Sequence, residues 1–293
     1  MIKVVNQNHA STLSDSVLVA MKARGYDIYV NKDGNDIFIN SKEWNEEKEH
    51  ELFNKYQLHT FREQTSDSEF NLVVFDPNYY EVCEGPNCMI TLQYKNLKNC
   101  EVPLPINLSS MCCMFCRCAE HVIDFSECDL SDIKSMQAAF NLSSVEKVIF
   151  GKQDFRKLIS VKDAFTQCFN LQYTDLCEQY LPNLKYAKCC FLSCTSLKRV
   201  DISSWKSLNL NAMAMFSDCV YLESCNISGL RLEGSHALFF NCKNLSNLIL
   251  GDTIISGEGL FGGCTKLFNL ATSSSTNTII SYLISREMIL GVT

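Results

Sequence analysis

The sequence has fewer basic residues than acidic ones, few prolines and no long apolar stretches. It has 293 residues, with 26 Lys or Arg against 33 Asp or Glu, so its net charge is −7. This balance disfavours non-specific nucleic-acid binding, because that binding depends on Lys and Arg that displace counterions from phosphates. No apolar stretch approaches the length of a membrane-spanning helix. We therefore expect neither direct nucleic-acid contact nor a membrane partner.

The first residues also lack the features of an export signal. Residues 1–9 show no charged region that leads into an apolar run of roughly 7–15 residues. We therefore expect a cytoplasmic protein, located in the producing cell or in a host cell. The 17 cysteines are then expected to stay reduced and to pack as small apolar side chains.

A motif with Phe, Cys and Leu at fixed spacing recurs from residue 115 onward. The pattern Phe-x-x-Cys-x-x-Leu has five clear copies, and two weaker copies precede them. The phenylalanines of the copies are Phe115, Phe140, Phe165, Phe191, Phe216, Phe239 and Phe261. A period of roughly 20–29 residues is typical of leucine-rich-repeat solenoids. One such repeat cannot bury its apolar side alone, so neighbouring repeats must stack.

Each repeat divides into two halves with different expected structures. The second half alternates apolar and polar residues, as a strand with one buried face does. In one copy the apolar members are Leu197, Val200 and Ile202. The half that carries Phe and Cys predicts a short helical or 3-10 turn on the convex side of the solenoid.

The N-terminal third does not repeat, and its patterns alternate between strands and helices. They predict strands over 2–5 and 70–75, and a hairpin over 26–40 around an Asp-Gly turn. Helices are expected over 11–25 and 41–56. These elements predict a small α+β domain.

The composition changes between the two parts of the chain. Four of the five prolines fall within residues 76–110, where we place the junction. We therefore predict an α+β N-terminal domain over residues 1–95. A leucine-rich-repeat solenoid with short parallel strands on its concave face and a C-terminal cap is expected over 96–293.

The repeats resemble BspA-type leucine-rich repeats over residues 108–273. In that family a Met-Phe or Ala-Phe pair is followed by two residues, Cys, two further residues and Leu. Met215, Phe216, Cys219 and Leu222 show this spacing. The resemblance implies a curved solenoid that binds proteins and carries no catalytic residues.

Alternation along the strands places one row of side chains on the outside of the solenoid, and we predict that this row binds a partner. Asp175 and Asp201 are expected on neighbouring strands, where like charges are unfavourable. That arrangement favours a basic partner, although water could also solvate both carboxylates. The predicted contact residues are Asp124, Tyr173, Asp175, Arg199, Asp201, Ser203, Ser224, Asn226, Asn247 and Asn269.

Some cysteines are more closely spaced than the repeat explains. Cys113 and Cys116 form a Cys-x-x-Cys pair, and a second pair drawn from Cys83, Cys88 or Cys100 would complete a tetrahedral zinc site. This candidate is weak beside the simpler interpretation that the thiols pack in the core. We therefore predict neither a metal nor another cofactor.

Motifs of the common enzyme classes do not occur in the sequence. His50 and Glu51 begin a zinc-protease motif, but Asn54 stands where its second His is needed. We predict a non-enzymatic effector or inhibitor that acts inside a cell and occupies a basic surface of a partner protein. Open alternatives are an enzyme in residues 1–95 targeted by the repeats, a BspA-like surface or adhesion protein whose export signal was removed, and a nucleic-acid mimic.

Overall fold

The computed structural model describes residues 1–6, 28–30, 37–39, 59–64, 70–84, 90–98, 100–105, 108–232, 234–267 and 269–272. The regular elements in these ranges are strands and a 3-10 helix, η3 (Asp175–Glu178). None of them is a helix with the length and hydrophobicity to span a bilayer. The predicted helices over 11–25 and 41–56, the Asp-Gly turn and the C-terminal cap lie outside the described residues.

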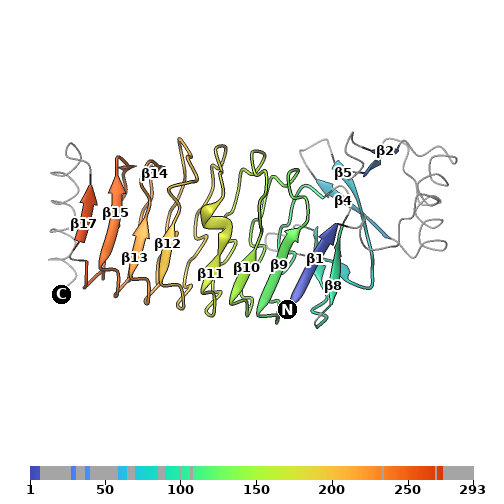
Figure 1. The fold of residues 1–293 in the computed structure, drawn as a ribbon, viewed down its shortest axis with the longest axis horizontal. Helices are drawn as coiled ribbons and strands as arrows, with labels where there is room; N and C mark the ends of the chain where they lie inside the picture. The colour runs from blue at the N-terminus through green and yellow to red at the C-terminus, as the bar shows by residue number, and fades with distance from the viewer. Residues whose placement is uncertain are drawn as a thin grey trace.

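The strands of the repeats lie parallel and side by side along the long axis of the molecule (Figure 1). They are β9 (Val122–Glu127), β10 (Lys147–Ile149), β11 (Tyr173–Thr174), β12 (Arg199–Asp201), β13 (Ser224–Asn226), β15 (Asn247–Gly251) and β17 (Asn269–Thr272). A separate two-stranded sheet pairs β14 (Arg231–Leu232) with β16 (Ile254–Ile255). The protein is therefore a β-solenoid with parallel strands, and the predicted stacking of repeats is confirmed.

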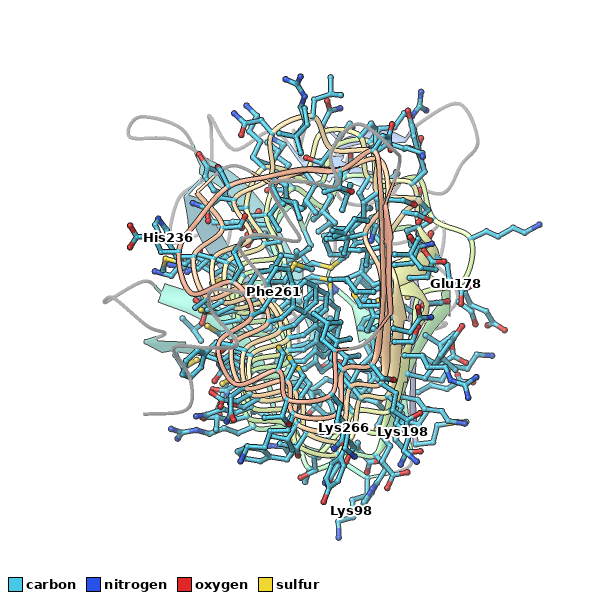
Figure 2. All side chains as sticks on the ribbon, turned by 90° about the vertical axis from the view of Figure 1, so that its left-hand side faces the viewer. Lys98, Glu178, Lys198, His236, Phe261 and Lys266 are labelled. Carbon is cyan, nitrogen blue, oxygen red and sulfur yellow. The ribbon has the colours of Figure 1, made fainter. Side chains whose placement is uncertain are left out.

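The repeat phenylalanines form one continuous stack inside the coil. The rings of Phe165, Phe191 and Phe216 lie 5.4 Å and 5.5 Å apart and are parallel to within 2°. Phe115, Phe140, Phe239 and Phe261 extend the stack at its two ends. Figure 2, viewed along the long axis, shows Phe261 inside the coil, between the strands near Glu178 and the turns near His236. Each ring is thus buried by the next repeat, which explains why the repeats depend on one another.

The turns around each stacked ring contain left-handed backbone on both sides of the Phe. Beside Phe165, Asp163 has a φ of 56° and Gln167 a φ of 59°, and Gly259 and Gly263 take the same places in the last copy. Such backbone costs a non-glycine residue roughly 1–2 kcal/mol. The amides of Asp163, Phe165 and Gln167 donate to carbonyls of the following repeat at 2.8–2.9 Å. These inter-repeat bonds offset the strain, so the Phe half is a ladder of turns.

The repeat cysteines have a specific structural role. The thiol of Cys194 donates to the carbonyl of Phe165 at 3.1 Å, and that of Cys219 donates to Phe191 at 3.0 Å. The same bond to the preceding repeat is made by Cys168, Cys242 and Cys264. Burial raises the pKa of Cys219 to about 12, so the thiol keeps the proton that it donates. Cys therefore joins neighbouring repeats as well as filling space.

The first strand of the chain joins the sheet of the solenoid. β1 (Ile2–Asn6) pairs in parallel with β8 (Glu101–Leu104) on one side and with β9 on the other. The other N-terminal strands form antiparallel hairpins: β2 (Ile28–Val30) with β3 (Ile37–Ile39), β4 (His59–Gln64) with β5 (Phe70–Phe75), and β6 (Tyr80–Glu84) with β7 (Ile90–Tyr94). The predicted strands in this region are confirmed.

A buried carboxylate ties one of these hairpins to the start of the solenoid. Glu63 of β4 accepts hydrogen bonds from the amide of Ser109 at 3.0 Å and from its hydroxyl at 2.6 Å. Together with β1, this contact links the N-terminal part of the chain to the repeats. The domain boundary near residue 95 stays a prediction.

Candidate functional site: a break in the strand face

The outward side chains of the strands line up from one repeat to the next. Arg199, Ser224, Asn247 and Asn269 occupy the same register on β12, β13, β15 and β17. Arg199 is exposed, and the side chains of Ser224 and Asn247 are partly exposed. The side chains of Arg199, Ser224 and Asn247 form an aligned row of the kind that the alternation predicts. We call this side of the solenoid the strand face.

The side chains of a second aligned row form hydrogen bonds within the fold. Asp201 Oδ1 accepts hydrogen bonds from the amide and hydroxyl of Ser203 at 3.0 Å and 2.6 Å, and Asn226 Oδ1 accepts the same pair from Ser228 at 3.1 Å and 2.8 Å. Asp124 accepts the amide two residues after it at 2.8 Å. Such turns compete with continued strand pairing. Asp201 and Asn226 therefore end β12 and β13, whereas β9 continues past Asp124 to Glu127. Contact of these side chains with a partner stays a prediction.

One side chain predicted to face outward lies inside the molecule. Asp175 is only 9 % exposed, and Cys177 is buried as well. The chain forms η3 directly after β11, so the alternation of a strand no longer applies. Asp175 instead accepts hydrogen bonds from the amides of Phe150 at 2.7 Å and Gly151 at 2.9 Å. The placement of Asp175 in the outward row is therefore wrong, and with it the expected like-charge pair with Asp201.

The ladder of strands is interrupted between β11 and β12. In other repeats the residue that begins the strand donates its amide to the preceding repeat, as Lys147, Ser224 and Asn247 do at 3.0, 3.2 and 3.1 Å. Arg199 makes no such bond to any residue that the structure describes. The strands accordingly form two sheets, in the orders β11-β10-β9-β1-β8 and β12-β13-β15-β17. The phenylalanine stack continues beneath, so the break is confined to the strand face.

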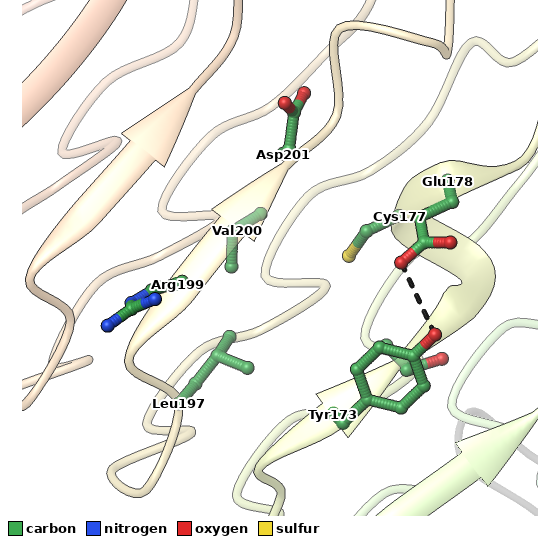
Figure 3. A pocket seen from close by; sticks show the side chains of 8 residues that line it. Tyr173, Cys177, Glu178, Leu197, Arg199, Val200 and Asp201 are labelled. Atoms are coloured by element: carbon green, nitrogen blue, oxygen red, sulfur yellow. Dashed lines mark hydrogen bonds between the residues drawn. The ribbon is translucent and has the colours of Figure 1, made fainter.

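A small cavity of about 70 Å³ opens at this break. Figure 3 shows it between β12 and the segment formed by β11 and η3. Its lining residues are Tyr173, Thr174, Cys177, Glu178, Leu197, Arg199, Val200 and Asp201. Tyr173 donates from its hydroxyl to Glu178 Oε1 at 3.3 Å, and Arg199 extends across β12 away from this pair (Figure 3). The cavity therefore combines buried Leu197 and Val200 with a polar rim.

Carboxylates dominate the electrostatics of the break. Burial, followed by the charges of Glu178 and Asp175, raises the pKa of Tyr173. Burial also raises the pKa of the Cys177 thiol, and the charges of Glu178, Asp175 and Asp201 add to the effect. Burial and the neighbouring carboxylates thus favour the neutral form of both groups. At Cys177 they disfavour the thiolate, which is the reactive form of cysteine.

The repeats on both sides hold η3 in place. From the following repeat, Trp205 donates from Nε1 to the carbonyl of Leu176 at 3.1 Å, and Ser204 donates to the carbonyl of Cys177 at 2.9 Å. On the other side, Gln179 donates to the carbonyl of Gly151 at 2.8 Å. Specific side chains therefore fix the break. The sequence contains one indication of the break. The spacing of 26 residues from Phe165 to Phe191 is the longest between neighbouring copies of the motif.

No family model, curated protein or solved structure matches this chain. What is shown is the β-solenoid fold. The resemblance to BspA-type repeats is a proposal.

Two of the cysteines considered for zinc lie on another part of the molecule. Cys113 is buried with Cys112 and Ala138, and partly buried Cys116 packs against them. Within the described ranges, no three His, Cys, Asp or Glu side chains gather in a way that could hold a metal ion. Cys88 lies outside those ranges.

Asp175 and Asp201 should respond in opposite ways to pH. Burial raises the pKa of Asp175 above its usual 3.8, although the amides of Phe150 and Gly151 oppose the shift. The folded state then holds the proton more tightly, so the stability that this group contributes falls as the pH rises from 3.8 through the raised pKa. Burial alone would raise the pKa of Asp201, but hydrogen bonds from Ser203 and Asn226 lower it below 3.8. Its contribution is present above pH 3.8 and is lost as the pH falls.

Urea unfolding of the wild type, Asp175→Asn and Asp201→Asn across about pH 3–7 checks this contrast. The free energy of unfolding of the wild type minus that of Asp175→Asn is expected to fall as the pH rises. The same difference for Asp201→Asn is expected to rise. Parallel pH profiles for the two variants would show that Asp175 is not the buried carboxylate described above.

Proposed function

We propose that this chain is a protein-binding solenoid and that its partner docks on the strand face at the break between β11 and β12. Tyr173 and Tyr180, before and after η3, are 42 % and 58 % exposed, and Arg199 is exposed across the break. Hot spots of protein interfaces are enriched in Tyr and Arg. The interruption of the strand ladder, flanked by these side chains, is the observation that carries the proposal.

We propose that the partner presents a basic surface at this site. Glu178 and Asp201 line the cavity and Asp175 lies behind them, whereas Arg199 is the only basic residue in the lining. Complementary charge guides association and specificity, and the net charge of −7 would attract a basic surface from a distance. This arrangement suits an effector or inhibitor that acts inside a cell and occupies a partner's basic surface. A relation to BspA-type leucine-rich repeats belongs to the same proposal.

The proposed contact set differs from the sequence prediction at three positions. Asp175 is removed because its side chain is buried. Glu178 is added because it is exposed and lines the cavity, and Tyr180 is added because it is exposed beside η3. The other proposed contact residues are Asp124, Tyr173, Arg199, Asp201, Ser203, Ser224, Asn226, Asn247 and Asn269.

Site-specific photo-crosslinking tests which face is used. A photoreactive amino acid is placed in the full chain at Tyr173, Arg199 or Ser224, and at His236 on the opposite side as the matched control (Figure 2). The three strand-face positions are expected to capture one common protein from cells, while position 236 does not. The yield should fall at high salt because exposed charges are then screened. Equal capture from position 236 would count against the strand face.

A further inference from the structure

Two adjacent thiols in the first repeat touch each other. The sulfurs of Cys112 and Cys113 lie 3.8 Å apart. Neighbouring side chains of an extended chain point to opposite sides. Cys113 instead has a left-handed φ of 56°, and both thiols belong to the buried cluster of Cys116 and Ala138. The turn has therefore brought two potential redox partners into contact.

This pair differs from the other thiols of the repeats. Cys168, Cys194, Cys219, Cys242 and Cys264 each donate to a phenylalanine carbonyl of the preceding repeat. The thiols of Cys112 and Cys113 have each other as hydrogen-bonding partner. Cys112 also retains 7 % exposure, whereas Cys194, Cys219 and Cys242 have none. Cys112 is thus more accessible than the thiols of the repeat ladder, although it is less exposed than Cys116 and Cys189. What distinguishes it is its contact with a second thiol.

The contact also gives the two thiols different acidities. A hydrogen bond from Cys113 lowers the pKa of Cys112 although burial opposes it, and the same bond, together with burial, raises the pKa of Cys113. Burial raises the pKa of nearby Cys116 and Cys118 as well. Since the thiolate is the nucleophile, Cys112 is favoured as the attacking sulfur and Cys113 as the proton-bearing neighbour.

We propose that Cys112 and Cys113 form a peroxide-reactive dithiol, in which Cys112 is oxidised first and Cys113 resolves it. The Cys112 thiolate attacks one oxygen of hydrogen peroxide, so that an S–O bond forms, the O–O bond breaks and hydroxide leaves. The Cys113 thiol then attacks the sulfenic sulfur, so that an S–S bond forms and the S–O bond breaks. The leaving hydroxyl takes up the thiol proton as water. The hydroxide of the first step takes up the proton that Cys112 released on ionisation, so overall two thiols are oxidised and one peroxide is reduced to two waters.

The resulting disulfide would be easily reversed. A trans peptide holds adjacent Cα atoms about 3.8 Å apart, which is shorter than the roughly 4.4–6.8 Å of ordinary disulfides. Strained disulfides are more oxidising and are the labile ones. The modification therefore suits a compartment in which thiol reductants restore the dithiol.

The dithiol lies beside a junction in the fold. Gln93 of β7 donates from its side chain to the carbonyl of Cys116 at 3.0 Å, and Cys83 of β6 donates to Gln93 Oε1 at 3.3 Å. The disulfide would thus form where the β6–β7 hairpin meets the first repeat, away from the break in the strand face. The proposal does not depend on partner binding.

Peptide mass spectrometry of the full chain tests the proposal. The reduced protein is treated with hydrogen peroxide for increasing times, remaining thiols are alkylated, and the peptides are quantified. Disulfide formation between Cys112 and Cys113 is detected as the loss of two hydrogens from their peptide. Its rate is expected to be at least tenfold higher than the rate at which the other adjacent pair, Cys189 and Cys190, is modified. Dithiothreitol should restore the dithiol of Cys112 and Cys113. Oxidation of Cys112 no faster than that of Cys189, or a disulfide to Cys83 or Cys116, would overturn the proposal.

Two variants separate the roles of the thiols. Cys113→Ser is expected to accumulate a sulfenic acid at Cys112 that dimedone traps, because the resolving thiol is gone. Cys112→Ser is expected to lose the fast reaction, and its persistence would contradict the assignment of the attacking sulfur. Circular dichroism confirms that each variant is folded, and if one is not, the wild-type peptide map decides alone.

Discussion

Replacement of Phe191 by alanine is expected to lower the free energy of unfolding by about 3–5 kcal/mol, the usual range for a buried Phe→Ala change. Phe191 is fully buried and stacks on Phe165 at 5.4 Å and on Phe216 at 5.5 Å. The variant loses the apolar burial of the ring and both stacking contacts, and it leaves a cavity in the middle of the solenoid. Urea unfolding followed by circular dichroism measures the change.

Phe169 provides the matched control for this experiment. It is the same residue type in the same repeat region, but it is 50 % exposed and stands outside the stack. Phe169→Ala is expected to change stability by less than about 1 kcal/mol. Similar losses for the two variants would show that the stack does not hold the repeats together.

The second large effect is expected at Trp205, which is fully buried and donates to the carbonyl of Leu176 in η3 at 3.1 Å. Trp205→Ala should lower the free energy of unfolding by about 3–5 kcal/mol through the lost burial. Trp205→Phe keeps most of the apolar volume but removes the indole donor, so the Leu176 carbonyl retains only its bond from the amide of Gln179 at 3.2 Å. That variant should lose about 0.5–1.5 kcal/mol, the net contribution of one typical hydrogen bond.

The same pair of variants tests how η3 is positioned. Urea unfolding gives the stability change, and crosslinking from Tyr173 reports the state of the proposed docking site. Trp205→Phe is expected to remain folded yet to crosslink more weakly, because η3 has lost one of its anchors. If Trp205→Phe is as stable as the wild type, the indole N–H does not anchor η3.

The repeated motif was enough to predict the stacked parallel strands, because each repeat presents the same apolar positions and cannot bury them alone. The role of Cys was predicted only as packing. Its hydrogen bond to the preceding phenylalanine carbonyl depends on how two copies sit against each other, which no single repeat encodes. The position of β1 beside β9 was also beyond the sequence, since it depends on pairing between residues more than a hundred positions apart.

The outward alternation of side chains was predicted correctly where the strands are regular. Arg199, Ser224 and Asn247 follow the alternation and share one register. The prediction failed at Asp175, because alternation assumes that the strand continues and η3 begins there. η3 is stabilised by the amides of Phe150 and Gly151 and the indole of Trp205, and by the hydroxyl of Thr174, which caps its N-terminus. The first three groups come from two other repeats, so the local sequence could not show them.

Residue-resolved hydrogen exchange of the free chain tests the central claim, an open strand ladder between β11 and β12, most directly. Ser224 and Asn247 donate their amides to the preceding repeat at 3.2 Å and 3.1 Å, and Arg199 does not. The account predicts that the Arg199 amide exchanges at least tenfold faster than the amides of Ser224 and Asn247. Equal protection at the three positions would mean that the ladder is continuous, and the proposed docking site would then not exist.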